Sequence, residues 1–334
     1  MRRVRMARAP FCTDPRLSWL VATLSGDHTE DAPYAALSHC WGAYEPLCKT
    51  TRGTIADRKT RIPWSLLPKT FQDAIEFIRR LGLRYLWIDT ICIIQDDTED
   101  WLRESTRMHS VYKNAFLTIA AASSRDSRDG LFSRTPGPFK IATLAKGSSW
   151  YNLLARPYYN HMFSGTRRET IPTETPLLGR GWVFQERLLS PRVLYFTNME
   201  LVWECRRAAN CECLKFRTDV TTSSAAKHQF RLEQCVPTST TLSMVSVSDW
   251  SSGWSYRPFT DDWIDIWHTI VGEYSQLKLT KESDRLPALS GVAQEIAIRR
   301  SDEKYLAGLW SGSLKKDLMW YTHRGVESMF PASI

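Results

Sequence analysis

Three stretches of this chain each carry a polar side chain at or beside the end of an apolar run, and this arrangement limits the folds available to it. The stretches are residues 34–42, 86–97 and 180–190, and the polar side chains are Ser38, Asp89 and Glu186. In α/β proteins, binding groups usually emerge where buried strands end and loops begin. The pattern therefore predicts an α/β protein whose functional site is built from these three segments.

The order of apolar patterns predicts a strand, a helix and a second strand. Residues 34–40 and 85–88 are short apolar runs, which are typical of buried strands. Between them, apolar side chains recur at helical spacing until Gly82 ends the pattern. These side chains are Phe71, Ala74, Ile75, Ile78 and Leu81. Two strands joined by a helix favour a parallel sheet with a right-handed crossover.

Further elements follow along the chain. The acidic residues at 96–100 suit the first turn of a helix, where negative charge is stabilised by the helix dipole, and this explains them without a metal ion. Residues 116–121 predict another buried strand, and a helix is expected from Gly181. Residues 192–196 and 201–205 indicate two strands of a hairpin.

The length of 334 residues and a hydrophobic content of 43% allow a large core. We expect an N-terminal segment over 1–29, an α/β core over 30–206, a Ser/Thr-rich linker over 207–260 and a mostly helical region over 261–334. Within the core, residues 123–179 form a long connection with little periodicity, in which some local strands are expected.

The charge and cysteine content exclude several classes of protein. The formal net charge is +8, but the basic residues are scattered among 36 acidic ones, so no nucleic-acid interface is predicted. Eight irregularly spaced cysteines without a signal peptide argue against a secreted disulfide framework. No apolar run of 18 residues occurs, so we expect no membrane span. The chain is predicted to be cytoplasmic, with an Arg-rich start that leaves a mitochondrial location open.

A zinc site is a weaker alternative within the cysteine pattern. The available ligands are Cys205, Cys211, Cys213, His228 and Cys235. Their spacing includes a C-x-C pair with irregular flanks rather than the usual C-x2-C pairs. We therefore predict no metal and no cofactor.

Together the three stretches resemble the HET domain, the heterokaryon incompatibility module of filamentous fungi. Its pattern has an L-S-Y-x-W-G-like box, a W-I-D-x-x-C-I-x-Q box and an R-G-W-x-x-Q-E-R box. The first box here reads L-S-H-C-W-G over 37–42, with His39 in place of the more usual tyrosine. The resemblance continues into residues 108–120 and 274–291. It implies a role in nonself recognition between fungal strains and in programmed cell death.

The order of the boxes also looks like that of TIR domains, flavodoxin-like modules in which an aromatic-Cys-x-x-Glu helix carries a catalytic glutamate. Trp182 and Glu186 have this spacing, with Val183 where the cysteine would be. The likeness implies a TIR-like parallel sheet flanked by helices, with additional strands. It also implies cleavage of the nicotinamide–ribose bond of NAD, with Glu186 as the catalytic carboxylate and NAD as a substrate.

The other expected site residues surround this carboxylate. The expected substrate-binding residues are Ser38, Trp41, Gly42, Asp89, Gln95, Trp182 and Gln185. Structural alternatives stay open for two of the acids: Glu186 pairing with Arg180 or Arg187, and Asp89 capping a loop. The rival function is a non-catalytic signalling or oligomerisation module of the same pathway. Expected partners are a second copy of the chain or a nonself-recognition protein.

Overall fold

The computed structural model describes residues 6–8, 19–23, 32–42, 48–132, 139–155, 175–206, 208–213, 217–219 and 263–319. Most of the predicted Ser/Thr-rich linker, including the zinc-ligand candidates His228 and Cys235, lies outside these residues. None of the helices in the described ranges has the length and apolar character needed to cross a lipid bilayer.

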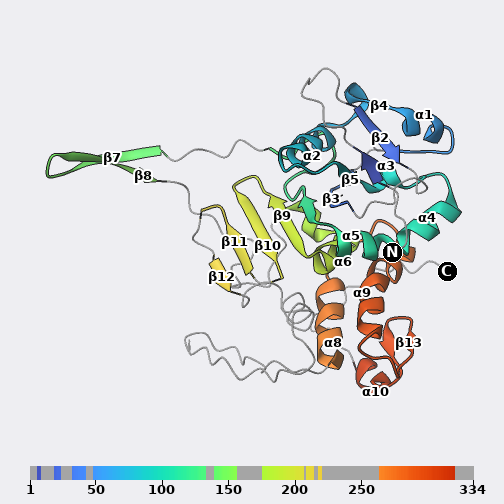
Figure 1. Cartoon of the computed structure of the whole chain (residues 1–334). Helices are drawn as coiled ribbons and strands as arrows, with labels where there is room; N and C mark the ends of the chain where they lie inside the picture. Colours follow the sequence, from blue (N-terminus) through green and yellow to red (C-terminus); the bar gives the residue numbers. More distant parts are fainter. Residues whose placement is uncertain are drawn as a thin grey trace, which may run out of the picture.

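A ten-stranded sheet forms the centre of the molecule, in the order β12-β11-β10-β9-β6-β3-β5-β1-β2-β4 (Figure 1). Its strands are β1 (Met6–Arg8), β2 (Trp19–Thr23), β3 (Tyr34–Ser38), β4 (Ile62–Pro63), β5 (Tyr85–Trp87), β6 (Leu117–Ala120), β9 (Arg192–Phe196), β10 (Leu201–Cys205), β11 (Ala208–Cys211) and β12 (Arg217–Asp219). The neighbours β5-β3-β6-β9 pair in parallel, and the remaining strands join antiparallel. The sheet therefore has a parallel centre and antiparallel edges.

The parallel centre has the strand order of a doubly wound fold. Numbered along the chain, its four strands lie in the order 2-1-3-4, which is the beginning of the flavodoxin-like order. The chain direction across the sheet reverses at β3, so the gap between the carboxyl ends of β3 and β6 is a topological switch point. Ligands of open α/β sheets bind outside the carboxyl ends of the strands at such a point. The predicted mixed α/β fold is confirmed, with β10 departing from the parallel order.

Helices cover both faces of this centre (Figure 1). The helices of this half are α1 (Ile55–Thr60), α2 (Lys69–Arg80), α3 (Asp89–Cys92), α4 (Thr98–Ser105), α5 (Met108–Asn114) and α6 (Gly181–Leu189), with short 3₁₀ turns at Trp64–Leu66 and Pro176–Gly179. Right-handed crossovers require the helix after β3 to lie opposite the helices that follow β5 and β6. The packing agrees, because α2 lies on one face while α5 and α6 contact each other on the other.

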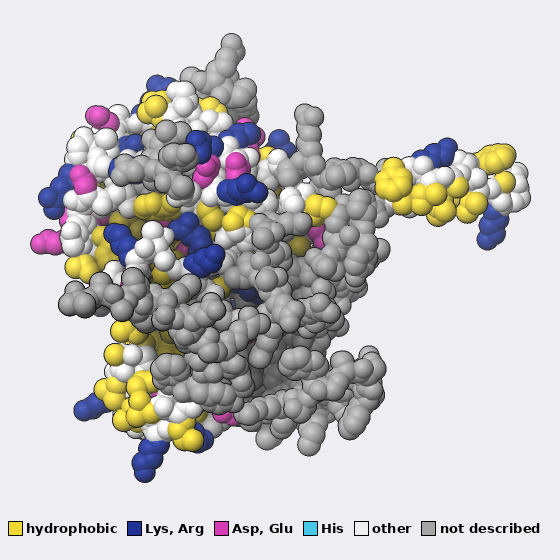
Figure 2. Space-filling model, turned by 180° about the vertical axis from the view of Figure 1, so that it is seen from behind, with side chains coloured by type: hydrophobic (Ala, Val, Ile, Leu, Met, Phe, Trp, Pro, Cys, Tyr) yellow, Lys and Arg dark blue, Asp and Glu magenta, His cyan; other side chains and the backbone are white. Residues whose placement is uncertain are grey.

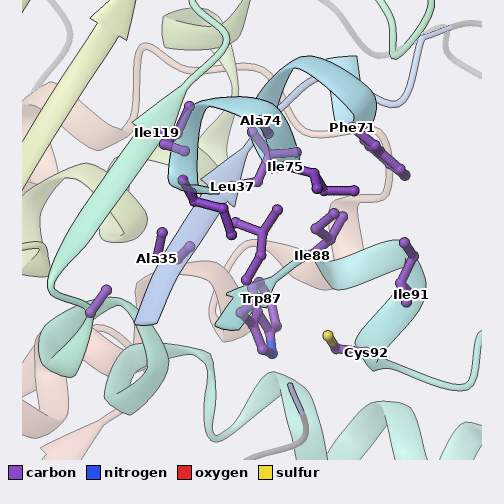
Figure 3. Close-up of a cluster of buried hydrophobic side chains, with 14 of the residues drawn as sticks. Ala35, Leu37, Phe71, Ala74, Ile75, Trp87, Ile88, Ile91, Cys92 and Ile119 are labelled. Atoms are coloured by element: carbon purple, nitrogen blue, oxygen red, sulfur yellow. The ribbon is translucent and has the colours of Figure 1, made fainter. Parts of the chain in front are cut away.

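Residues of β3 alternate between these two faces. Leu37 pairs in register with Ile119 and packs with Ala74 and Ile75 of α2 in the main apolar cluster (Figure 3). Ala36 pairs with Trp87, whose ring meets Tyr112 of α5 edge to face. Because side chains alternate along a strand, Ser38 shares the face of Ala36 and points toward α5 and α6.

The helices predicted over 71–81 and from the acidic segment at 96–100 are confirmed, with a small change at the end of the first. The helix predicted from Phe71 is α2, which ends before Gly82, and Gly82 has φ +76°. Leu81 does not belong to its buried face, because it follows the last helical turn and is exposed. The acidic segment begins α4 as expected: the Asp97 carboxylate accepts hydrogen bonds from the backbone N–H groups of Glu99 and Asp100.

A second apolar core joins the C-terminal helices to α6. It contains α8 (Trp263–Tyr274) and α9 (Pro287–Ala297), and α9 packs directly on α6. The other elements there are a 3₁₀ turn at Glu282–Asp284, the small hairpin β13 (Tyr305–Leu306) and β14 (Leu309–Trp310), and α10 (Leu314–Asp317). The helical C-terminal region is therefore confirmed, and it holds α6 from the side opposite the sheet.

The long connection after β6 contains a hairpin of β7 (Phe139–Lys146) and β8 (Ser149–Ala155), paired antiparallel. It extends away from the sheet (Figure 1) and carries hydrophobic side chains along its visible face (Figure 2). Phe139, Ile141, Leu144, Trp150 and Tyr151 are all exposed, Trp150 by 74%.

Candidate active site

Glu186 lies on α6 beneath the switch point of the sheet. Contacts at both ends of α6 hold its backbone in place. Ser190 ends the helix by donating its hydroxyl to the Glu186 carbonyl at 2.6 Å, and the same hydroxyl bonds to Thr118 of β6 at 2.7 Å. At the other end of α6, Gly181 allows Leu279 to approach, since a Cβ there would lie 2.5 Å from Leu279 Cδ2. The helix is therefore clamped between the sheet and the C-terminal region.

The carboxylate of Glu186 is buried and lacks a full set of partners. The residue is 6% exposed, and its Oε2 has no hydrogen-bond partner within the described residues. Burial raises the pKa of Glu186 to about 7; nearby Ser38 opposes this rise, Asp89 adds to it, and Tyr112 and Arg180 oppose it more weakly. A buried, incompletely paired carboxylate costs folding energy, and such groups are often retained for function.

The hydroxyl groups of Ser38 and Tyr112 complete the inner wall of this site. Ser38 is buried at the carboxyl end of β3, and its Oγ forms no hydrogen bond of good geometry within the described residues. Tyr112 donates its hydroxyl to the Leu37 carbonyl at 3.2 Å, and burial raises its pKa. Both hydroxyls therefore offer polar contacts to a group placed beside Glu186.

Asp89 and Trp41 form the outer part of the site. Trp41 donates its indole N–H to Asp89 Oδ2 at 2.8 Å, which links the loop after β3 to the end of β5. Asp89 Oδ1 accepts a hydrogen bond from the Thr90 backbone N–H at 2.6 Å, so the predicted loop-capping role is also present. The Asp89 side chain is 23% exposed, and Trp41 is partly exposed. This pair therefore reaches the surface above the buried Glu186.

His39 is a site residue that the sequence singled out only as a departure from the HET pattern. Its ring is buried against Phe71, with Nδ1 at 3.7 Å from Asp89 Oδ1 and no hydrogen bond of either ring nitrogen in the described part of the chain. Burial lowers its pKa, Asp89 opposes this, and Arg180 adds to it. A neutral imidazole beside Asp89 is the expected state at pH 7.

Gly42 is required by the conformation of the loop after β3. It has φ +86°, and a Cβ at this position would lie 2.4 Å from Cβ of Asp126. The sequence predicted that glycine would let this loop approach a substrate closely. The observed close approach is to the protein's own segment after β6, so the glycine joins the two loops on either side of the switch point.

Gly42→Ala is therefore expected to destabilise the protein by about 2–4 kcal/mol, since it combines left-handed backbone strain with a steric clash. Gly82→Ala is the matched control, because Gly82 has φ +76° but nothing within 4 Å of the added Cβ. It should cost only the backbone strain, about 1–2 kcal/mol. Urea denaturation of both variants measures the difference, and equal losses would contradict the close packing on Asp126.

Three of the predicted substrate-binding residues lie elsewhere. Gln95 donates its amide N–H₂ to the backbone carbonyls of Asp89 and Ile93, so it supports the Asp89 loop from behind. Trp182 donates its indole N–H to Asp284 at 3.0 Å, and Gln185 is buried next to Gly291 of α9. The structure thus brings together Ser38, Trp41, Asp89 and Glu186, with Gly42 adjacent, while Trp182 and Gln185 face the C-terminal region.

Of the two arginines expected as partners of Glu186, Arg180 lies near it and Arg187 pairs with another carboxylate. Arg187 lies near Glu204, with Nε at 3.4 Å from its Oε2, rather than near Glu186. Arg180 lies close enough to lower the pKa of Glu186 and of the Cys40 thiol, whose pKa burial raises. The nearness of Arg180 agrees with one of the two pairings expected from the sequence. No sequence pattern indicated the role of Tyr112, because helical spacing reports burial and not which group a side chain meets.

Comparison with known proteins bears on this arrangement. The family model described as "Heterokaryon incompatibility protein (HET)" matches residues 34–186, from the first residue of β3 to Glu186 itself. The chain contains a HET domain. No curated protein and no solved structure matches the chain. The HET match spans all four clustered residues and the whole parallel centre except β9, so the site lies inside the HET domain.

Proposed function

We propose that this HET domain cleaves the bond between nicotinamide and ribose in NAD, with Glu186 as the catalytic carboxylate. The observation that carries the proposal is the buried Glu186 Oε2 without a hydrogen-bond partner in the described residues, beneath the switch point and beside Ser38, Tyr112 and Asp89. The TIR resemblance of the Trp182–Glu186 spacing supports the choice of substrate. The cellular role that follows is nonself recognition leading to programmed cell death.

The chemistry suits one carboxylate near hydroxyl groups. Nicotinamide carries a positive charge in NAD, and it leaves as a neutral molecule by taking the electron pair of the C1′–N bond. The ribose is left with oxocarbenium character, which a nearby carboxylate stabilises, as in glycosidases. Water then adds to C1′ and loses a proton, giving ADP-ribose. Ser38 and Tyr112 would bind ribose hydroxyls, and Trp41 would stack on an aromatic ring of the substrate.

The electrostatics around Glu186 favour binding of a cation. The Asp89 carboxylate repels the ionised form of the buried Glu186, and this repulsion contributes to the raised pKa of Glu186. A positively charged nicotinamide ring next to Glu186 would relieve the repulsion and favour the ionised form. Because Glu186 is only 6% exposed, NAD can reach it only if nearby side chains move. The partly exposed Trp41, which bonds to Asp89, is the side chain that we expect to move.

Incubation of the purified chain with NAD tests the proposal by release of nicotinamide. Glu186→Gln should reduce the rate at least about 100-fold, because it removes the negative charge that stabilises the transition state. Glu282→Gln is the matched control, since Glu282 is a highly exposed carboxylate of the C-terminal region and should leave the rate unchanged. Equal rates of nicotinamide release in the wild type and in Glu186→Gln would contradict a catalytic role of Glu186.

The pH dependence of the same reaction has a defined direction. Glu186 must be ionised to stabilise the cation, and its pKa in the free protein is about 7. The value of kcat/KM should therefore rise with pH through about 7 and fall roughly tenfold for each pH unit well below it. A flat profile between pH 5.5 and 8 would contradict an essential Glu186 carboxylate.

The alternative is a non-catalytic signalling module that works by self-association, and the β7–β8 hairpin favours it. An isolated two-stranded hairpin is marginally stable in water, and exposed apolar patches of this kind usually contact a partner. Trp150 and Tyr151 lie on its exposed surface. Replacing both by Ser should lower any self-association measured by analytical ultracentrifugation, while leaving NAD cleavage by the monomer intact if the two functions are separate.

A further inference from the structure

A cluster of two cysteines and a buried acid lies at the β9–β10 end of the sheet, away from Glu186. The Sγ atoms of Cys211 and Cys213 and a carboxylate oxygen of Glu200 all lie within 4.8 Å of one another. Glu200 and Cys211 are buried, and Cys213 is partly exposed. The cluster therefore brings two sulfur atoms and one oxygen atom close together, and the partly exposed Cys213 connects it to the surface.

From this geometry we propose that Glu200, Cys211 and Cys213 bind a soft divalent cation of the Zn²⁺ class. Thiolates and a carboxylate are established zinc ligands, and three protein ligands leave a fourth position for water or another group. The Cys211 and Cys213 sulfurs are 3.0 Å apart. Two sulfurs on a tetrahedral zinc ion stand roughly 3.8 Å apart, given a Zn–S length of about 2.3 Å. A small rotation of the partly exposed Cys213 side chain provides this opening.

The backbone around the cluster holds its ligands in place before any ion arrives. Thr197 fixes the turn that carries Glu200: its hydroxyl donates to the Glu200 carbonyl at 2.6 Å and accepts from the Glu200 N–H at 3.0 Å. The Glu200 carboxylate accepts the Cys213 N–H at 3.2 Å. Glu212 pairs with Leu201 through its backbone N–H and through its side chain. Pre-organised ligands lose little entropy on binding a metal.

The charges of the cluster also favour a cation. A buried carboxylate is costly beside groups that themselves become anionic, and deprotonating either thiol next to Glu200 would add a second negative charge. A divalent cation removes this penalty, because it binds the deprotonated sulfurs and the carboxylate together and releases the thiol protons to solvent.

The cluster is distinct from the proposed catalytic site. The carboxyl ends of β9 and β11 lie on the same edge of the sheet as Ser38, but β6, β9 and β10 separate β11 from β3. The sequence pattern alone did not predict a metal here, because the C-x-C pair lacks a second pair. The third ligand, Glu200, is brought in by the β9–β10 turn and the antiparallel pairing of β10 with β11.

The test uses the full chain, purified under reducing conditions and titrated with Zn²⁺ and Co²⁺. We expect one ion per chain, and a near-ultraviolet thiolate-to-cobalt absorption band in the Co²⁺ form. Glu200→Gln should weaken Zn²⁺ binding about 10–100-fold. Cys213→Ser should at least halve the cobalt band, because Cys211 is then the one thiolate left in the cluster. Cys205→Ser is the matched control, since Cys205 is a cysteine of β10 outside the cluster, and it should bind both ions normally.

Two outcomes would overturn the proposal. One is Zn²⁺ binding that is unchanged in both Cys213→Ser and Glu200→Gln. The other is a Cys211–Cys213 disulfide that persists under reducing conditions and leaves no thiols to titrate. Circular dichroism of Cys213→Ser shows whether it folds; if it does not, Glu200→Gln and the Co²⁺ spectrum of the wild type decide the question.

Discussion

Replacing Glu186 by Gln is expected to raise the free energy of unfolding by about 2–3 kcal/mol at pH 8, while removing the proposed NAD cleavage. The folded-state pKa of Glu186 is about 7, compared with 4.5 for an unperturbed glutamate. Ionised Glu186 therefore destabilises the folded protein by about 1.4 kcal/mol for each unit of this difference. A neutral Gln avoids most of that cost, although its buried amide offsets about 1 kcal/mol of the gain.

The sign of this effect depends on pH in a defined way. A raised carboxyl pKa means that the folded protein binds the proton more tightly, so the wild type loses stability as pH rises from about 4.5 to about 7. At pH 5 the two proteins should differ by less than about 1 kcal/mol. Urea denaturation at pH 5 and pH 8 measures the change, and Glu282→Gln should show no such pH dependence. A Glu186→Gln variant less stable than the wild type at pH 8 would contradict the buried, strained carboxylate.

A more stable Glu186→Gln variant would also show that any loss of activity is not caused by misfolding. A catalytic variant that loses activity through misfolding gives the same silence as one that loses its chemistry. Because Gln at position 186 is expected to stabilise the fold, loss of nicotinamide release in a more stable protein points to the carboxylate itself. A gain in stability on removing a side chain is typical of groups kept for function.

Apolar periodicity located the main elements of the fold well. The hairpin predicted over 192–196 and 201–205 coincides with β9 and β10, and the helix predicted from Gly181 is α6. These segments are short, strongly patterned and bounded by turn residues, so local sequence decides them. The position of Ser38 and Asp89 near one edge follows from the same patterns, because the carboxyl ends of the parallel strands β3 and β5 meet there.

The side-chain contacts of the candidate site depend on segments that are distant in the sequence, and no local pattern encodes them. Gln185 was expected to bind substrate through its amide group, but a helix rotates consecutive side chains by about 100°, so Gln185 faces Gly291 while its neighbour Glu186 faces the site. His39 meets Asp89, and Gly42 meets Asp126, only because loops from different strands converge. The β7–β8 hairpin, by contrast, is a local element and agrees with the strands expected within the connection over 123–179.

The ion pair of Arg187 with Glu204 carries the second large expected effect, because it anchors α6, the helix that carries Glu186, to the sheet. Glu204 is fully buried, accepts a hydrogen bond from the Tyr195 hydroxyl and lies 3.4 Å from Arg187 Nε. Burial works against the charge on Arg187, yet Glu204 outweighs it and raises the Arg187 pKa. The pair is therefore ionised, and each charge depends on the other.

Glu204→Ala is expected to destabilise the protein by about 3 kcal/mol, since it removes the buried Glu204 carboxylate from the partly buried Arg187. Adding Arg187→Met should restore part of the loss, because an apolar side chain of similar length removes the guanidinium charge that Glu204 had neutralised. The exposed pair of Arg285 and Glu282 provides the contrast, and Glu282→Gln should cost no more than about 0.5 kcal/mol. Urea denaturation of the three variants and the wild type measures these differences.

The same variants connect stability with the site. Arg187 follows Glu186 directly on α6, so losing the anchor to β10 should loosen the placement of the carboxylate beneath Ser38. A shift of about 1 Å in a catalytic group can cost about 100-fold in rate. NAD cleavage by Glu204→Ala should therefore fall even at temperatures where the variant is folded, and Glu204→Ala with Arg187→Met should recover stability without recovering the full rate. Full recovery of both would show that the ion pair supports the fold alone and does not position Glu186.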